Sequence, residues 1–294
     1  MQEVSSPAPA RPGAQPMFII GAAALWGTAG TVGAFAPDSA TPLSIAAARL
    51  VIGGLLLAFL AGGTIAATRA APLPMISTAI AAAAYQACFF WSVSRTGVAV
   101  GTVVALGSGP VFTGLITWFA DRRRPSGRWL AATSAAVLGC VVLTLGGAVG
   151  EVDPAGVLIA LLAGLVYAFY AVVAAHMIAK GVPSSTMMGV MFGGAGVVML
   201  PVLALSDLSW LGEPSGLAVA GYLGCATTAL ACFLYGRGLR STPVATASTL
   251  TLAEPGVAAV LGVAVLGERL GAVSWAGMAL LGVSLALLAV RRST

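Results

Sequence analysis

Residues 87–110, ACFFWSVSRTGVAVGTVVALGSGP, return in residues 231–255 as ACFLYGRGLRSTPVATASTLTLAEP. One inserted residue keeps the two copies in register and sets Gly109-Pro110 opposite Glu254-Pro255. Two shorter matches precede them in the same order, Leu25-Trp26-Gly27 with Val166-Tyr167-Ala168 and Thr41-Pro42 with Val182-Pro183. With the long match counted as two, one on each side of the inserted residue, four matches in one consistent order indicate that the chain consists of two copies of one unit.

The composition places both units in a membrane. Hydrophobic residues make up 59% of the chain and charged residues only 8%, whereas a soluble domain carries about 25% charged residues. A hydrocarbon core about 30 Å thick takes about 20 residues of helix, and apolar stretches of that length recur throughout the sequence. The 38 glycines fit the same interpretation, because small residues let helices approach closely in lipid.

Proline, glycine and charged residues divide the sequence into ten predicted spans, five in each unit. We place them at residues 17–36, 43–62, 74–94, 98–119, 129–147, 155–178, 185–205, 216–236, 244–266 and 271–290. Because five is odd, the second unit enters the membrane from the opposite side, which gives the inverted repeat common among secondary transporters.

The predicted fold is therefore an all-α integral membrane protein of ten transmembrane helices, arranged as two inverted five-helix repeats. We expect a disordered cytoplasmic tail at residues 1–16, a first repeat at 17–147 and a second repeat at 155–290.

The basic residues predict the orientation. If the N-terminus is cytoplasmic, only Arg95 and Arg269 fall on the outer side, and Arg49 lies within a span. The cytoplasmic segments then hold Arg11, Arg69, Arg122, Arg123, Arg124, Arg128, Lys180, Arg237, Arg240, Arg291 and Arg292. The positive-inside rule thus puts both termini in the cytoplasm and the chain in the inner (plasma) membrane. The same rule accounts for the net charge of +5, so we expect no nucleic acid as a partner.

The ordered motifs resemble the drug/metabolite transporter superfamily, specifically its ten-helix EamA-type members. The likeness runs from Met17 to Val290. It is carried by Leu25-Trp26-Gly27 in span 1, Arg49 in span 2, Pro110 and Glu254-Pro255 in spans 4 and 9, and Leu266-Gly267-Glu268-Arg269-Leu270 before span 10. The first unit departs from the pattern, because Asp121-Arg122-Arg123-Arg124 stands where the second has Gly-Glu-Arg.

The resemblance implies a solute exporter that works by alternating access. Its central cavity is expected between spans 1, 3, 4, 6, 8 and 9, with spans 5 and 10 as buttresses. The chain looks most like the YddG-type amino-acid exporters. Phosphate and nucleotide-sugar carriers of this fold need basic residues in the cavity, and here only Arg49 lies mid-span.

We therefore expect export of amino acids with broad specificity, aromatic ones included. Another small metabolite or a drug is the alternative cargo. The expected partners are a small-molecule substrate and the lipid bilayer, with the protein a monomer or weak dimer. No cofactor and no metal is expected.

Candidate substrate-binding residues are the polar and aromatic side chains on the predicted lining spans. They are Trp26, Tyr85, Gln86, Phe89, Tyr167, Tyr170, Thr251 and Glu254. A buried amide such as that of Gln86 is costly in lipid without a partner. Trp91 and Tyr235 fall near opposite membrane surfaces, where we expect them in interfacial aromatic belts.

Pro110 and Pro255 are predicted helix breaks at equivalent positions of the two units. A proline inside a helix removes the hydrogen bond to the carbonyl four residues earlier, so the carbonyls of Leu106 and Thr251 are freed. Two interpretations stay open: these carbonyls accept a hydrogen bond from a substrate ammonium in a watery cavity, or neighbouring groups satisfy them.

Glu254 falls about ten residues into span 9, near the bilayer midplane, where a carboxylate costs several kcal/mol unless it is compensated. Either it pairs with Arg49 or with hydroxyls such as that of Thr251, or it binds a substrate ammonium or a proton. Arg49 is expected to form a structural pair with Asp38 or Glu254. His176, the only histidine, is expected at a solvated helix end.

Two other function classes fit the sequence less well. An intramembrane serine protease would need a Gly-x-Ser-Gly turn and a membrane histidine, but residues 106–109, LGSG, lack the first glycine and His176 lies at a membrane edge. A non-transporting membrane scaffold has no signature of its own, and inverted repeats mainly serve alternating access. We predict a transporter and not an enzyme.

Overall fold

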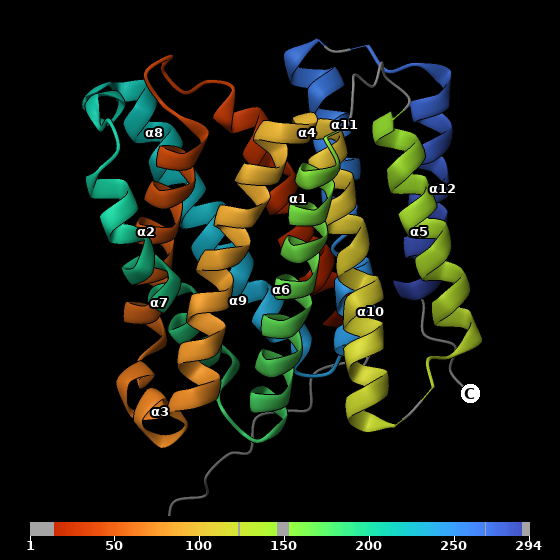
Figure 1. Cartoon of the computed structure of the whole chain (residues 1–294), viewed down its shortest axis with the longest axis horizontal. Coiled ribbons are helices and arrows are strands. Elements are labelled where there is room, and N and C mark those ends of the chain that lie inside the picture. Colours follow the sequence, from red (N-terminus) through yellow and green to blue (C-terminus); the bar gives the residue numbers. More distant parts are fainter. Residues whose placement is uncertain (1–14, 123, 146–152, 268, 290–294) are drawn as a thin grey trace, which may run out of the picture.

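The computed structural model describes residues 15–122, 124–145, 153–267 and 269–289, and all regular structure among them is helical (Figure 1). Ten segments of this part are long and apolar enough to cross a membrane. Each lies within a few residues of a predicted span, so the predicted all-α membrane fold is confirmed. Of the predicted tail, residues 1–14 lie outside the described part, and Gln15 and Pro16 already belong to the first helix.

The first half contains five helices. They are α1 (Gln15–Gly33), α2 (Pro42–Ala61), α3 (Thr64–Ala70), α4 (Pro72–Asp121) and α5 (Gly127–Leu145). Helix α4 carries spans 3 and 4, which meet at Gly97 with φ 80° and ψ 161°. Only glycine adopts this backbone conformation readily, so Gly97 separates the two spans where the sequence predicts a loop. The seven-residue α3 is too short to have been predicted from apolar periodicity.

In the second half, two of the spans are irregular. The regular helices are α6 (Pro154–Ala179), α7 (Ser184–Ala204) and α12 (Ala272–Ala289), and a 3₁₀ turn, η1 (Ser209–Gly212), precedes span 8. Span 8 consists of α8 (Pro214–Tyr222), the π-helix η2 (Leu223–Leu230) and α9 (Ala231–Leu239). Span 9 is broken between α10 (Val244–Leu250) and α11 (Ala253–Leu266). The sequence predicted span 8 as uninterrupted, and in span 9 it predicted a helix break at Pro255, a few residues after the observed one.

Prolines set where several spans begin. Pro42, Pro72, Pro154 and Pro214 each occupy the first residue of a helix, where the missing N–H has no intrahelical partner to lose. At α2 the preceding Thr41 also accepts a hydrogen bond from the backbone N–H of Ser44 at 3.1 Å. These residues explain why the predicted and observed starts agree closely.

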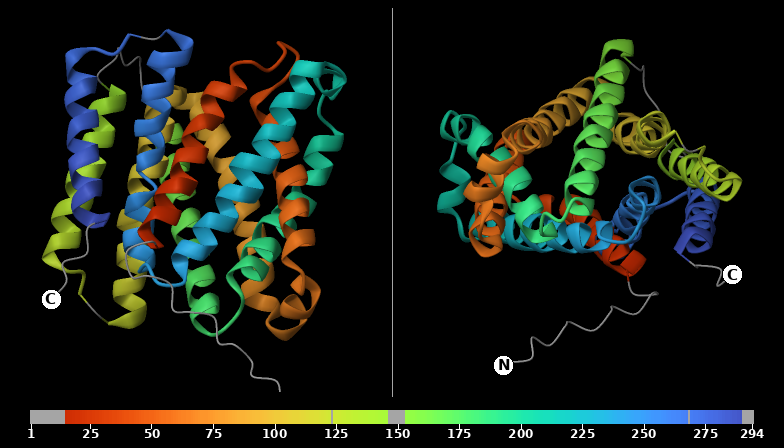
Figure 2. Two further views of the ribbon diagram at one scale, coloured as in Figure 1. Left: turned by 180° about the vertical axis from the view of Figure 1, so that it is seen from behind. Right: turned by 90° about the horizontal axis from the view of Figure 1, so that it is seen from below.

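The helices pack as an inverted repeat requires. The equivalent spans α2 and α7 pack against each other, as do α5 and α12. Helix α1 packs on α9 and α11. Its equivalent α6 packs on both halves of α4, with Gly156 beside Thr96 and Gly164 beside Ser108. Figure 2 places α5 and α12 side by side at one edge of the bundle, in the position expected of buttresses.

Glycines allow the closest of these contacts. A Cβ atom on Gly54 of α2 would lie 2.1 Å from the backbone oxygen of Phe192 in α7. In the α5–α12 pair, a Cβ on Gly139 would lie 2.9 Å from the oxygen of Gly277, and one on Gly277 would lie 2.8 Å from the oxygen of Gly139. Because lipid supplies no hydrophobic force between helices, such close backbone packing holds the bundle together.

One ion pair lies within the described residues. Arg95 Nη1 is 2.9 Å from Asp153 Oδ2, and both side chains are partly exposed. The hydrogen bonds from Arg95 and from the backbone N–H of Ala155 lower the pKa of the Asp153 carboxyl. Asp153 also caps α6, so this contact fixes the start of the second repeat against the end of span 3.

The tight α2–α7 contact predicts a stability effect. Gly54→Ala should lower the free energy of unfolding by about 1–3 kcal/mol, because the new methyl group overlaps a backbone oxygen of α7. Gly30→Ala is the matched control, since nothing lies within 4 Å of a Cβ there. Thermal unfolding followed by size-exclusion chromatography in detergent measures both, and equal melting temperatures for the two variants would contradict the packing.

Candidate functional site

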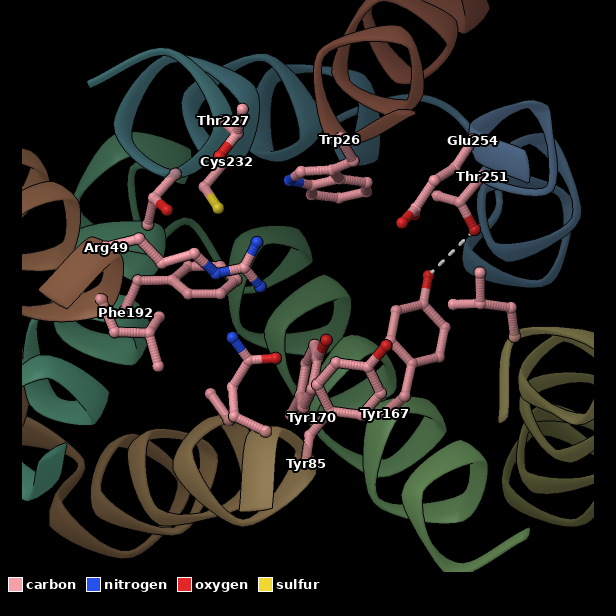
Figure 3. Close-up of a pocket in the computed structure, with 15 residues that line it drawn as sticks. Trp26, Arg49, Tyr85, Tyr167, Tyr170, Phe192, Thr227, Cys232, Thr251 and Glu254 are labelled. Carbon is pink, nitrogen blue, oxygen red and sulfur yellow. Dashed lines mark hydrogen bonds between the residues drawn. The ribbon is translucent and has the colours of Figure 1, made fainter. Parts of the chain in front are cut away.

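A cavity of about 80 Å³ lies at the centre of the bundle, where residues from both repeats meet (Figure 3). One water needs roughly 10–15 Å³ by this measure, so the cavity has room for a small polar solute. Its wall is formed by Trp26, Arg49, Leu50, Ala82, Tyr85, Gln86, Leu106, Tyr167, Tyr170, Phe192, Thr227, Thr228, Cys232, Thr251 and Glu254.

Seven of the eight residues predicted as substrate-binding line this cavity. The exception is Phe89, which helical spacing places one turn from Tyr85. Its ring stacks on Tyr85 with centroids 6.0 Å apart and packs beside the buried Ala105, Ala160 and Ala163. Phe89 therefore packs against the Tyr85 ring without lining the cavity. The prediction that it binds substrate directly is not supported.

Aromatic rings form one side of the cavity. The Tyr85 ring lies 6.1 Å from those of Tyr167 and Tyr170, and the latter two lie 5.3 Å apart, between centroids. Trp26 packs on Tyr235 at 5.5 Å. Tilted and edge-to-face contacts of this kind hold the rings in fixed orientations, so the aromatic wall is preorganised.

A hydroxyl network joins α6 to spans 8 and 9. The Tyr167 hydroxyl lies 3.3 Å from the Tyr235 hydroxyl and 3.4 Å from Thr251 Oγ1. Tyr235 is only 1% exposed, so the expectation of an interfacial tyrosine was wrong. Its helix turns the ring toward Trp26 and Tyr167, whereas Trp91 is 58% exposed, as a lipid-facing residue would be.

Arg49 is held by Gln86, an arrangement that the sequence did not predict. With the Gln86 amide oriented so that its oxygen faces α2, this oxygen accepts from Arg49 Nη2 at 2.6 Å and from Nε at 3.3 Å. The predicted partners are not used: Asp38 is exposed in the loop before α2, and no ion pair within 4 Å joins Arg49 to Glu254 in the described residues. The buried amide of Gln86 thus has the partner that burial demands.

Glu254 lies in the first turn of α11, directly after the break in span 9. Its backbone N–H donates to the carbonyl of Thr251 at 3.0 Å. This carbonyl receives no hydrogen bond from Pro255, which has no N–H, but Glu254 supplies the donor instead. The Thr251 hydroxyl donates to the carbonyl of Ser248 at 2.8 Å. The break therefore exposes the Glu254 side chain to the cavity and not an unsatisfied carbonyl.

Pro110 does not interrupt its helix. Helix α4 continues past it, and its neighbour Gly109 gives room to Tyr167, whose ring would lie 3.0 Å from a Cβ at that position. The two equivalent prolines thus have different effects, because span 4 keeps its helical course and span 9 does not.

Eight of the lining residues were not among the predicted substrate-binding side chains, although the sequence analysis considered the carbonyl of Leu106. They are Arg49, Leu50, Ala82, Leu106, Phe192, Thr227, Thr228 and Cys232, the last within the repeated ACF motif. Thr227 and Thr228 both donate to the carbonyl of Leu223 inside η2, at 2.7 and 3.0 Å. A π-helix has no simple sequence signature, but the ACF repeat was a signal that could have marked Cys232.

Neither serine-protease element is arranged for catalysis. The Ser108 hydroxyl donates to the carbonyl of Ala105 in its own helix at 3.3 Å. His176 is exposed at the end of α6. A nucleophile and its base must lie within hydrogen-bond reach, and no hydrogen bond joins these two side chains in the part of the chain that the structure describes.

Comparisons with known proteins agree with this architecture. A model of the EamA-like transporter family matches residues 15–145 and again residues 154–290. The Uncharacterized transporter YwfM of Bacillus subtilis is 41% identical over 268 residues, with 90% of each chain covered. The Threonine/homoserine exporter RhtA of Escherichia coli K12 is 30% identical over 261 residues, covering 86% of this chain and 83% of its own.

RhtA of Salmonella typhimurium LT2 is 31% identical over 233 residues, covering 77% of this chain and 74% of its own. One crystal structure superposes with a TM-score of 0.77 at 18% identity, covering 93% of this chain and 96% of that chain, which supports the fold. YwfM and RhtA are named as a transporter and an exporter, and the matched family is one of transporters and not of enzymes. The EamA-type resemblance is confirmed, and the YddG-type subgroup stays a prediction.

The hydroxyl network gives a second stability prediction. Tyr167→Phe should lower the free energy of unfolding by about 0.5–1.5 kcal/mol, the usual net value of a buried hydrogen bond, because its hydroxyl serves both Tyr235 and Thr251. Tyr170→Phe is the control, since among the described residues its hydroxyl has no hydrogen bond. Equal losses in thermal unfolding for the two variants would show that the network contributes nothing.

Proposed function

Because the chain belongs to the EamA-like transporter family, we propose that it exports amino acids from the cytoplasm through the central cavity. The cavity opens alternately to the two sides of the membrane as the repeats move against each other. Transport tolerates a range of amino-acid side chains, because the aromatic wall offers contact area without fixed side-chain-specific pairs.

The observation that carries this proposal is the composition of the cavity wall. It combines aromatic rings with one arginine and one glutamate at a depth where the spans are broken or π-helical. Irregular helices and charged residues at membrane depth mark solute sites in transporters. A volume of about 80 Å³ favours a small metabolite over a drug, since pockets that bind drug-sized ligands have volumes of roughly 300–1,000 Å³.

The relatives support the same class of cargo. RhtA is named as an exporter of threonine and homoserine, two small amino acids, and its sequence aligns with 86% of this chain. A solute of that size suits the central cavity better than a nucleotide sugar, which would also need several basic residues for its phosphates.

We further propose that the protein lies in the inner membrane with both termini in the cytoplasm. Helix α3, at the bottom of Figure 1, contains Arg69, and the segments after α4, α6 and α9 on the same side contain Arg124, Lys180 and Arg240. The segments at the other end of the spans contain Asp38, Arg95 and Arg269. The excess of basic residues on the first side supports its assignment to the cytoplasm.

Cysteine labelling tests this orientation. In a variant without the four native cysteines, Ser39→Cys should react with a membrane-impermeant maleimide added to intact cells. Pro125→Cys should react only after the cells are opened, because its loop faces the cytoplasm. The reverse pattern would invert the topology, and equal labelling of both from outside would contradict the assignment of the two loops to opposite sides.

Transport into proteoliposomes tests the cargo. Purified protein should take up labelled threonine, leucine and phenylalanine above protein-free liposomes, and ignore a labelled nucleotide sugar. Leu106→Trp fills the cavity and should reduce uptake at least 10-fold. Leu115→Trp, on the same helix but 40% exposed, should transport like the parent.

Uptake of the nucleotide sugar without the amino acids would exclude the proposed cargo. A Leu106→Trp protein that folds and transports like the parent would exclude the central cavity as the route.

A further inference from the structure

Two opposite charges face the central cavity without neutralising each other. Arg49 comes from α2 and Glu254 from α11, and Figure 3 shows both side chains directed into the cavity from different sides. The one ion pair among the described residues joins Arg95 to Asp153 elsewhere. A charged side chain inside a membrane protein is costly, and such residues are either paired with each other or mark the path of a solute. Because Arg49 and Glu254 form no ion pair with each other, a role in binding the solute is the alternative.

The guanidinium group of Arg49 is held along one edge only. Gln86 accepts from its Nε and Nη2 atoms at 3.3 and 2.6 Å. An arginine carries five N–H donors, so the Nη1 nitrogen and the outer hydrogen of Nη2 remain for another acceptor. Two parallel N–H groups match the two oxygens of a carboxylate, and Gln86 fixes the plane in which they point.

The carboxylate of Glu254 is the complementary group. Within the described residues it has no ion pair and accepts no hydrogen bond, while its own backbone N–H is used by the carbonyl of Thr251. An ionised carboxylate is acceptor-only. A cationic group with several N–H donors, such as an ammonium, is the solute group that suits it.

We propose that Arg49 binds the carboxylate, and Glu254 the ammonium, of one zwitterionic α-amino acid. This inference rests on the proposed function and specifies its substrate class. The solute supplies both missing counter-charges at once, so the loaded cavity has no net charge left unpaired. The side chain of the bound amino acid points to the aromatic wall of Tyr85, Tyr167 and Tyr170. This wall has no charged group, so it selects weakly among amino-acid side chains. Solutes that lack either charge leave Arg49 or Glu254 without a partner.

Competition in the parent protein tests the pair of contacts. Uptake of labelled threonine, leucine and phenylalanine is measured at pH 7, where the α-amino group of a free amino acid is protonated. The competitors are the unlabelled amino acid, its methyl ester and its N-acetyl derivative. The ester lacks the carboxylate and the acetylated form lacks the ammonium, so each should compete at least 10-fold more weakly than the amino acid.

Two variants assign the contacts. Arg49→Gln should weaken binding of the amino acid at least 10-fold and leave competition by the methyl ester unchanged, because the ester has no carboxylate to lose. Glu254→Gln should weaken the amino acid and leave the N-acetyl derivative unchanged. Arg240→Gln, an exposed arginine outside the cavity, is the control and should affect none of the three.

Each outcome decides between the proposals. If amino acids are carried but both derivatives compete as strongly as the unlabelled amino acid, the recognition by two charges is wrong and the proposed function stands. If no amino acid is carried, both are wrong. If Arg49→Gln weakens ester and amino acid equally, Arg49 has a structural role only. Where a variant does not fold, the parent competition decides alone.

Discussion

Inside a bilayer, every backbone N–H and carbonyl group has to find its partner within the protein. This constraint explains why all regular structure in the described residues is helical. It also requires that the backbone groups be satisfied in another way at the two places where a span departs from the α-helix. These places are η2 in span 8 and residues 251–252 in span 9. Both border the central cavity, and at both the local groups are satisfied: Leu223 by threonine hydroxyls and Thr251 by the N–H of Glu254.

The repeat builds a nearly symmetric scaffold, and substitutions at equivalent positions make the site asymmetric. Trp26 and Tyr167 are equivalent, and both line the cavity. Glu254 corresponds to Gly109, where the Tyr167 ring takes the space of a side chain. By the same alignment Arg49 corresponds to Val190 and Gln86 to Leu230. One repeat therefore provides the cationic end of the cavity and the other its anionic end.

Much of this fold could be predicted from the sequence, because span length, composition and the order of motifs are local properties. The ten spans, the inverted order of the repeats and seven of the cavity residues followed from them. Contacts between helices did not. The rotation of α9 that buries Tyr235, the packing of Phe89 against span 4 and α6 and the pairing of Arg49 with Gln86 depend on how helices face one another. Periodicity fixes a face of a helix but not its neighbour.

The α5–α12 contact has a consequence for how the two repeats can move. Gly139 lies against the carbonyl of Gly277, and Gly277 against that of Gly139, on helices that belong to different repeats. An approach this close leaves no space for a side chain at either position, so α5 and α12 are held together by backbone packing. We therefore expect this pair to move as one body and to serve as the fixed joint between two halves that shift elsewhere.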